Sequence, residues 1–441
     1  MTQKRKLFEE VGSTKRAEIP AAAGMIDAGR RGAREAIRIW LWLLFGLVVV
    51  MIAVGGLTRL TDSGLSITEW RPVTGALPPM TAEAWAVEFD KYRAIPEYQL
   101  QNKGMSLAEF QFIYWWEWGH RQLGRAIGLV WALGFFGFVI AGKMPRGRAG
   151  LAPLLGALAV IALAIGAQVA AASGHLAKTQ ADAISLASGL GAAGLAIAYL
   201  AAPARDWTAR LLFLGLLGGL QGFIGWWMVS SGLGGEMLDV ASYRLATHLG
   251  LAFVILGLIA WHIYTLGRDD RDLLQARRSA EPKLFSMSTG LLHLAFVQIL
   301  LGALVAGIDA GRTYNDWPLM AGGFFPPYPF DIDPVWRNFF ENAGLVQFLH
   351  RMAGYLLMIF AVVVWLRARR SPNSDTRFRF HAVLAMMTLQ LVLGVVTVLY
   401  MAQLEIAILH QIGAVVLWAL ILRARFAARY PVQQSVRGAA K

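Results

Sequence analysis

The chain contains the segment GGLTRLTDSGLSITEWRPVTGALPP (residues 55–79) and, further on, the related segment GALVAGIDAGRTYNDWPLMAGGFFPP (residues 302–327). Three pairs of residues in them align at one constant offset, namely Asp62 with Asp309, Gly64 with Gly311 and Trp70 with Trp317. Similarity between two distant parts of one chain indicates that a structural unit has been duplicated.

Three further pairs of segments follow in the same order. EWGHRQLG (117–124) parallels QFLHRMAG (347–354), LQGFIGWWMV (220–229) parallels LQLVLGVVTV (389–398), and ATHLGLAFVILGLIAW (246–261) parallels ILHQIGAVVLWAL (408–420). We interpret the unit as four transmembrane helices, which return the chain to its starting side and give both copies one orientation. The sequence therefore predicts two tandem four-helix bundles related by a pseudo-two-fold axis along the membrane normal.

The composition supports a membrane protein, since 56% of the 441 residues are hydrophobic, only 16% are charged and the mean hydropathy is +0.50. The apolar residues form blocks of about 20 residues, which is the length of a membrane-spanning helix. We expect ten such helices at about 37–60, 118–141, 152–173, 184–202, 210–232, 243–267, 287–308, 344–366, 380–401 and 404–422. The first block follows a long polar arm, so we do not interpret it as a cleavable signal peptide.

The net charge of +13 is distributed unevenly. Successive loops between the predicted helices lie on alternate sides of the membrane. Lys and Arg are concentrated in the loops of one side, whereas Asp and Glu predominate in those of the other side. Positively charged loops stay in the cytoplasm, so both termini are predicted to be cytoplasmic, and residues 61–117 and 309–343 to face outward. A nucleic-acid-binding protein would instead gather its basic residues on one folded face, so we expect no nucleic-acid partner.

The predicted organisation has two bundles joined by polar segments. One stretch, 144–209, lacks a counterpart in the second half and is interpreted as an inserted helical hairpin whose small residues suit close packing. The predicted units are a cytoplasmic arm (1–36), an N-terminal bundle (37–267) that includes the hairpin, a cytoplasmic linker (268–286), a C-terminal bundle (287–425) and a cytoplasmic tail (426–441).

Four of the eight histidines lie at the outer ends of predicted helices, two in each repeat: His120, His248, His350 and His410. The chain has no cysteine, so a metal would have to be held by His, Met or oxygen ligands. Helices diagonally opposed in a bundle are about one haem width apart, so two imidazoles can approach a haem iron from opposite faces. Zinc held by each pair, or a transporter that uses the histidines as proton relays, are the alternatives.

The two predicted sites differ in one important residue. Glu117 lies one helical turn before His120, whereas the equivalent position in the second half is Gln347. This difference suggests chemistry at the first site and electron transfer at the second, with Glu117 as a proton donor or acceptor or as a stabiliser of positive charge. A plain salt bridge between Glu117 and Arg121 is the alternative role.

Several arginines lie near the predicted sites, and their guanidinium groups are suited to binding haem propionates. Contact with lipid headgroups is the alternative for them. The candidates are Arg121, Arg125, Arg244 and Arg351.

Taken together, these segments resemble the haem A synthase family, whose members oxidise the C8 methyl group of haem O to the formyl group of haem A. The resemblance rests on GGLTRLTDSGLSITEWRP, WEWGHRQLGR, LQGFIGWWMVSSGL, YRLATHLGL, LHRMAGY and LHQIGA. It implies haem b at His350 and His410, and a substrate haem O site at His120 and His248 with Glu117 beside it. Many bacterial members carry a cysteine pair in the first outer loop, and this chain resembles the cysteine-free class shared with mitochondrial enzymes.

The resemblance also implies a place in the cell and a set of partners. We expect a multi-pass protein of the bacterial inner membrane, with its sites near the periplasmic side, that serves terminal oxidase assembly. A haem O synthase, an electron donor and a second copy of the chain are candidate partners besides haem O and the bilayer. A di-haem cytochrome that passes electrons from quinol, or a histidine-using proton-coupled transporter, remain alternative functions.

Overall fold

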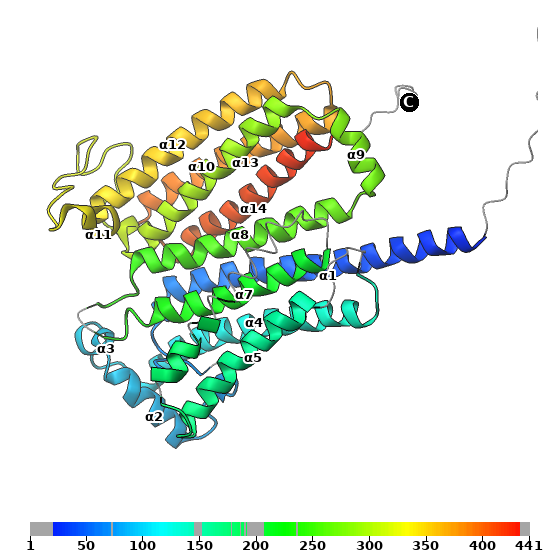
Figure 1. Ribbon diagram of the computed structural model, residues 1–441. Helices are drawn as coiled ribbons and strands as arrows, with labels where there is room; N and C mark the ends of the chain where they lie inside the picture. The colour runs from blue at the N-terminus through cyan, green and yellow to red at the C-terminus, as the bar shows by residue number, and fades with distance from the viewer. Residues whose placement is uncertain are drawn as a thin grey trace, which may run out of the picture.

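The computed structural model describes residues 21–71, 74–144, 152–177, 179–185, 187, 188, 191, 207–234 and 237–432. Within these residues the chain forms helices and no β-strand. Figure 1 shows long helices that run side by side, with α9 (Asp270–Arg278) at one end of the molecule and α11 (Asn338–Glu341) at the other. The prediction of an all-helical membrane protein is therefore confirmed.

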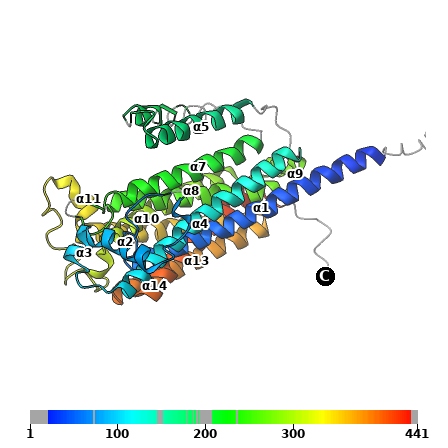
Figure 2. The same cartoon turned by 90° about the horizontal axis from the view of Figure 1, so that it is seen from below.

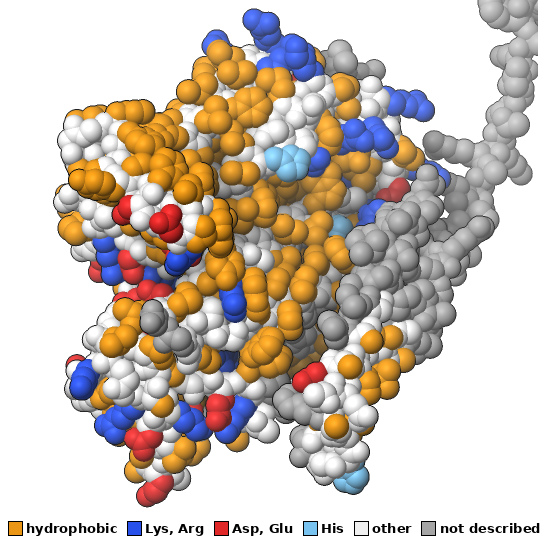
Figure 3. All heavy atoms as spheres, turned by 60° about the vertical axis from the view of Figure 1, so that its left-hand side comes forward, with side chains coloured by type: hydrophobic (Ala, Val, Ile, Leu, Met, Phe, Trp, Pro, Cys, Tyr) orange, Lys and Arg blue, Asp and Glu red, His pale blue; other side chains and the backbone are white. Residues whose placement is uncertain are grey.

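Eight of the described helices are long and apolar enough to cross a membrane. They are α1 (Ala21–Leu60), α4 (Leu107–Ile140), α7 (Trp207–Val229), α8 (Ser242–Leu266), α10 (Pro282–Gly307), α12 (Ala343–Ala368), α13 (Ser374–Leu399) and α14 (Leu404–Arg429). Each overlaps one predicted crossing. Apolar side chains cover much of the molecular flank seen in Figure 3, as contact with lipid requires.

The two further predicted crossings belong to the insertion 144–209. The first coincides with α5 (Ala152–Ala172), which Figure 2 shows at the periphery of the other helices. The second, at 184–202, lies almost wholly outside the described residues. His175, which we expected at the outer turn of this hairpin, is exposed, and its Nδ1 lies 3.0 Å from Ser173 Oγ.

Two helices begin earlier than the apolar pattern predicted. Helix α1 starts at Ala21 instead of 37, and α4 starts at Leu107 instead of 118. The early start of α4 has a local cause, because Ser106 and Glu109 form a capping box in which each side chain binds the backbone N–H of the other. The first turns of α4 are themselves largely apolar and aromatic, and the capping box is the signal that marks their start.

The eight long helices form two closed rings of neighbours. In the first ring α1 packs against α4 and α8, and α7 packs against α4 and α8. In the second ring α10 packs against α12 and α14, and α13 packs against α12 and α14. The rings meet where α8 contacts α10 and α14 and where α1 contacts α14. Figure 1 shows α8 between the remaining helices of the two rings.

One hydrophobic core extends through both rings and their interface. Leu41 of α1, Phe253 of α8 and Leu291 of α10 are each at most 2% exposed. The edge of the Phe253 ring meets the Trp418 ring of α14 at a centroid distance of 5.9 Å. Because these side chains lie between the rings, the burial of their apolar surface holds the two halves together.

The first helix of each ring ends in the same kind of turn. Asp62 follows α1 with φ 49°, and Asp309 follows α10 with φ 51°, so both adopt the left-handed conformation that Asp tolerates better than most residues. These are the two aspartates that align in the sequence repeat. The turns lead into loops that lie at one end of the molecule, with α2 (Ala82–Arg93), α3 (Pro96–Leu100) and α11 (Figure 1).

The first of these loops has a small core of its own. The Phe89 ring stacks on Phe110 at 4.8 Å, and Tyr92 lies 5.3 Å from Phe110. Thr81 caps the start of α2 by accepting a hydrogen bond from the Ala84 N–H. The loop is therefore a folded element packed on the beginning of α4 rather than an extended connection.

Candidate functional site

The four repeated histidines occupy equivalent places in the two rings. Each imidazole directs its Cε1 edge at a glycine of a neighbouring helix in its own ring, and a Cβ atom built on that glycine would fall within van der Waals contact or closer. The distances are 3.4 Å for Gly55 and His120, 3.0 Å for Gly225 and His248, 3.0 Å for Gly302 and His350, and 3.2 Å for Gly394 and His410. Both the histidines and their glycines align between the halves. Each ring therefore contains two such histidine–glycine contacts, and each has an equivalent in the other ring.

The histidines also form pairs. His120 of α4 and His248 of α8 are close enough for a charge on one imidazole to act on the other. The same holds for His350 of α12 and His410 of α14. The members of each pair lie on the second and fourth long helices of their ring. Within the described residues no group of three or more His, Asp or Glu side chains could hold a metal ion.

Glu117 is buried, and its carboxylate is surrounded by hydrogen-bond donors. Its Oε2 accepts from Ser66 Oγ at 2.8 Å and from the Ile67 N–H at 2.7 Å. Its Oε1 accepts from Arg121 Nε at 3.0 Å and from Nη2 at 2.6 Å. These four hydrogen bonds join α4 to the first outer loop.

Arg121 binds the same loop segment. Its Nη2 donates to the Ile67 carbonyl at 2.8 Å, and its Nη1 donates to the Glu69 carbonyl at 3.0 Å. Glu117 and Arg121 therefore hold both backbone groups of Ile67. The salt bridge that we considered as the alternative role of Glu117 is present, and it forms part of a loop anchor.

The second half contains a similar anchor in which an amide takes the place of the carboxylate. Gln347 Nε2 donates to the Tyr314 carbonyl at 3.0 Å, and Arg351 donates to the carbonyls of Tyr314 and Leu319 at 3.2 and 3.0 Å. Tyr314 is the repeat equivalent of Ile67. The two loops are thus held at the same place, by a carboxylate and an arginine in one half and by an amide and an arginine in the other.

The remaining candidate arginines bind backbone carbonyl groups. Arg125 Nη2 donates to the Arg71 carbonyl at 3.0 Å. Arg244 Nη1 donates to the Trp227 carbonyl at 2.6 Å, and its guanidinium lies 4.6 Å from the centre of the Trp227 ring. Both side chains thereby hold together segments at the end of the molecule that carries α2 and α3.

A cavity of about 340 Å³ lies beside this anchor, between the first outer loop, α2 and α4. Arg121 and Arg125 line it together with Arg71 and Lys91. The carboxylates of Glu69 and Glu88 also line it, but the cations outnumber them. This balance of charge is suited to an acidic group of a ligand.

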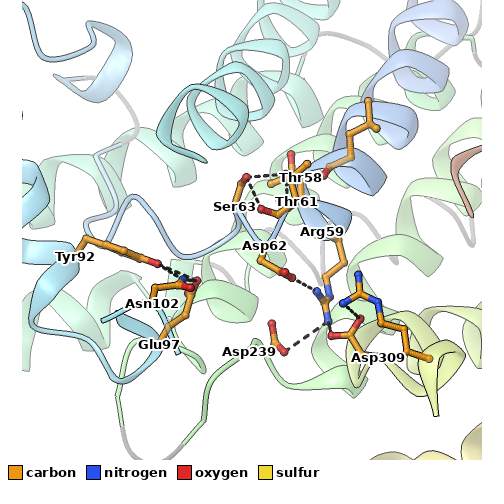
Figure 4. A network of polar contacts seen from close by, with 12 residues as sticks. Thr58, Arg59, Thr61, Asp62, Ser63, Tyr92, Glu97, Asn102, Asp239 and Asp309 are labelled. Atoms are coloured by element: carbon orange, nitrogen blue, oxygen red, sulfur yellow. Dashed lines mark hydrogen bonds and ion pairs between the residues drawn. The ribbon is translucent and has the colours of Figure 1, made fainter. Parts of the chain in front are cut away.

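Sequence reasoning did not predict the ion cluster around Arg59. Arg59 Nη1 lies 2.7 Å from Asp62 Oδ1, and its Nη2 lies 2.7 Å from Asp309 Oδ2 and 3.6 Å from Asp239 Oδ2 (Figure 4). Burial raises the pKa of the Asp239 carboxyl, while the charge of Arg59 opposes that effect. The cluster joins the equivalent turns of the two halves, which shows that Arg59 does not simply extend toward lipid headgroups.

Three glutamines beside the histidines were also missed, although the sequence carried a signal for them. Gln221, Gln298 and Gln390 each precede a histidine-facing glycine by one helical turn. A search for residues on the same helix face as those glycines would have found them.

The eight long apolar helices define an all-helical, multi-pass membrane protein. A family model described as cytochrome oxidase assembly protein (COX15-CtaA) matches residues 38–202 and 183–422. The chain belongs to this family, and the resemblance to haem A synthases seen in the sequence is confirmed.

Curated relatives match along the whole chain. A Heme A synthase of Ruegeria sp. (strain TM1040) is 57% identical over 436 residues, covering 98% of this chain and 99% of the relative. The Heme A synthase of Dinoroseobacter shibae is 59% identical over 440 residues, covering 100% of both chains. That of Paracoccus denitrificans is 54% identical over 435 residues, covering 99% of each.

Proposed function

We propose that this protein, a membrane oxidoreductase that converts haem O to haem A, binds its substrate in the N-terminal ring and a resident haem b in the C-terminal ring. The observation that carries this division is the repeated histidine pair with only one adjacent carboxylate. His120 and His248 would bind the iron of haem O, and His350 and His410 that of haem b. Haem b bound by two imidazoles would supply one-electron transfer.

The residues present fit a haem in both rings. Each ring offers one pair of repeated imidazoles and no cysteine, and bis-histidine ligation requires nothing else from the protein. The Nδ1 atom of His410 is buried without a hydrogen-bond partner among the described residues, as are the Oε1 atoms of three nearby glutamines. Such unpartnered polar atoms are costly unless a bound group reorganises them.

Glu117 acts, in this proposal, as a fixed negative charge beside His120. Oxidation of a methyl group to a formyl group withdraws electrons from the substrate, and an anion held in place stabilises positive charge that develops there. Protonation of Glu117 would weaken its four hydrogen bonds, so its contacts support this electrostatic role over that of a proton carrier. Through Ile67 it also holds the first outer loop against α4.

Arg121 and Arg125 are proposed to receive haem propionates, because both line the basic cavity at the edge of the first ring. Arg351 would serve the haem of the second ring in the same way. We propose Arg244, which lies one turn before His248, as a further contact for the substrate.

The two halves are proposed to be duplicated bundles related by a pseudo-two-fold axis along the membrane normal, with boundaries at 37–267 and 287–425. The equivalent helix contacts and the equivalent turns at Asp62 and Asp309 support this proposal. We further propose cytoplasmic termini, the bacterial inner membrane and sites on the periplasmic side. Reporter fusions in the outer loops and at both ends would test the orientation.

The identity of the co-purifying haems tests the proposed function. Purified protein should have the spectrum of a low-spin haem, and solvent extraction should yield haem b together with haem O or its oxidised derivatives. Protein that contains haem b alone under conditions of haem O supply would support electron transfer without synthesis. Pull-down with a haem O synthase and mass measurement of the purified assembly would test the proposed partner and a homo-oligomer.

A further inference from the structure

Three of the four repeated histidines have a glutamine beside them, and the fourth does not. Each glutamine lies one helical turn before the glycine that faces the imidazole. The sets are Gln221 and Gly225 beside His248, Gln298 and Gly302 beside His350, and Gln390 and Gly394 beside His410. At the corresponding place beside His120, one turn before Gly55, the chain has Met51.

The three glutamines bind their histidines in the same way. Gln221 Nε2 donates to the His248 carbonyl at 2.9 Å, and Gln298 Nε2 donates to the His350 carbonyl at 3.1 Å. Gln390 Nε2 donates to the His410 carbonyl at 3.0 Å. The histidine helix is thereby fixed to its neighbour at the level of the imidazole in three places.

Two of these amides, those of Gln221 and Gln298, also reach the imidazole rings. Gln221 Nε2 lies 3.2 Å from His248 Nδ1, and Gln298 Nε2 lies 3.1 Å from His350 Nδ1. The Oε1 atoms of these two glutamines and of Gln390 are buried and have no hydrogen-bond partner among the described residues. An imidazole that binds iron through one nitrogen presents the other as an N–H donor that needs an acceptor. A half-turn of the amide would bring this free oxygen to Nδ1, in exchange for the hydrogen bond from Nε2 to the histidine carbonyl.

Met51 occupies the equivalent place in the first ring. A Cβ atom on Gly124 would lie 3.4 Å from Met51 Cε, and one on the equivalent Gly354 would lie 3.2 Å from Gln298 Nε2. The thioether of methionine is only a weak hydrogen-bond acceptor and cannot donate. Among the described residues, His120 is thus the one repeated histidine with no glutamine one turn before its facing glycine and no amide bonded to its backbone or ring.

We propose that Gln221, Gln298 and Gln390 are positioning residues that fix three histidines for haem binding, and that Met51 leaves His120 as the releasable ligand. This inference rests on the proposed function, in which the first ring must exchange haem O for haem A while the second keeps haem b. A ring held by an amide loses little orientational freedom on binding iron, whereas a freely turning ring loses more and dissociates more readily.

Exchanging the side chains between the halves tests this proposal. Met51→Gln introduces the missing amide, and Met51→Leu is its matched control because it keeps an apolar side chain of similar volume. Gln298→Met and Gln390→Met make the reverse change. The purified proteins would be mixed with excess apomyoglobin, and the release of each haem would be followed by absorbance and by chromatography of the haem that remains.

Met51→Gln should slow the release of haem O and haem A by about 10-fold or more, because groups that hydrogen-bond to a metal ligand change metal-site affinity by about 10- to 100-fold. The same variant should lower kcat without raising KM. Met51→Leu should release them at the wild-type rate. Gln298→Met and Gln390→Met should release haem b faster by a similar factor and alter the low-spin electron paramagnetic resonance spectrum. These resonance changes distinguish ligand positioning from a loss of stability.

Wild-type release rates in Met51→Gln would overturn the assignment of His120 as the releasable ligand. Unchanged haem b release and resonance spectra in both reverse variants would overturn the positioning role of the glutamines. Because glutamine already occurs at this place three times in the fold, Met51→Gln is informative even if a reverse variant fails to fold. Retention of haem b by both His350→Ala and His410→Ala would instead contradict the proposed function itself.

Discussion

Glu117 and Arg121 form an ion pair on one face of α4, with Arg121 Nε 3.0 Å from Glu117 Oε1, and each side chain binds a backbone group of Ile67. The pair places a fixed carboxylate beside His120 and holds the first outer loop over the same region. In the second half Arg351 has Gln347 as its neighbour at 3.3 Å. A single difference between two otherwise matching anchors thus separates the two sites.

Replacing Glu117 with Gln should largely preserve the fold, because the second half already uses Gln at that place. Haem A formation should fall by about 100-fold or more, since removal of one preorganised electrostatic contact costs this much in other enzymes. Chromatography of extracted haems would measure the product, and the haem b spectrum would serve as a folding control. Undiminished haem A formation would contradict the role of Glu117. The matched control is Gln347→Glu, which should still form haem A.

His350→Ala or His410→Ala should remove haem b from the purified protein, because one remaining imidazole cannot complete the low-spin site. His120→Ala and His248→Ala should keep haem b and abolish haem A formation. The pyridine haemochrome assay measures the haem content of all four variants. Wild-type haem b content in either second-half variant would refute the ligand assignment.

Gly225→Ala should displace His248, because the new Cβ would lie 3.0 Å from its Cε1. We expect a marked loss of haem A formation with little change in haem b. Gly222→Ala, on the same helix, is the matched control, since a Cβ there meets nothing within 4 Å. Equal activity of the two variants would show that the imidazole tolerates displacement.

Arg59→Gln should loosen the contact between the two halves, because it leaves Asp62, Asp239 and Asp309 facing one another without their shared cation. The Arg59 side chain is only 13% exposed, so we expect a loss of about 1–3 kcal/mol in stability, visible as a lower Tm in detergent. Arg312 lies 3.6 Å from Asp309 but is 43% exposed, so Arg312→Gln should change the Tm little. A similar Tm for both variants would contradict a special role of Arg59.

Glu97 should make the first outer loop sensitive to pH. It is 4% exposed, accepts a hydrogen bond from the Tyr92 hydroxyl at 3.1 Å (Figure 4), and burial raises its pKa from 4.5 to about 8. Between about pH 4.5 and pH 8 the folded loop therefore retains a proton that the unfolded loop releases. The stability of the loop should fall across this range by up to about 1.4 kcal/mol per pH unit and should level off above it.

Hydrogen exchange of residues 82–106 at pH 6 and pH 9 would measure this effect. Exchange, corrected for the intrinsic effect of pH, should be less protected at pH 9. Glu97→Gln should remove the difference, because an amide does not titrate in this range. A pH-independent wild-type loop would show that Glu97 is already charged in the folded protein.

The sequence alone was sufficient for the membrane class and the approximate place of eight helices, and it put the four repeated histidines forward as candidates. Apolar blocks of fixed length and an internal repeat are local or linear signals, and a bilayer forces such blocks into helices. The predicted start of α1 was wrong because polar helical turns that extend beyond the apolar block look like loop in a hydropathy pattern, and that of α4 was wrong because its capping box at Ser106 and Glu109 was not considered.

Only the tertiary structure decided which groups these side chains actually contact. Glu117 and Arg121 lie one turn apart on one helix, but their hydrogen bonds to the Ile67 backbone depend on how a loop distant in sequence folds back. Arg59 meets Asp309 from the other half of the chain, and the glutamines meet their histidines across helix interfaces. Such contacts depend on the register and rotation of packed helices, which the order of residues in a single helix does not specify.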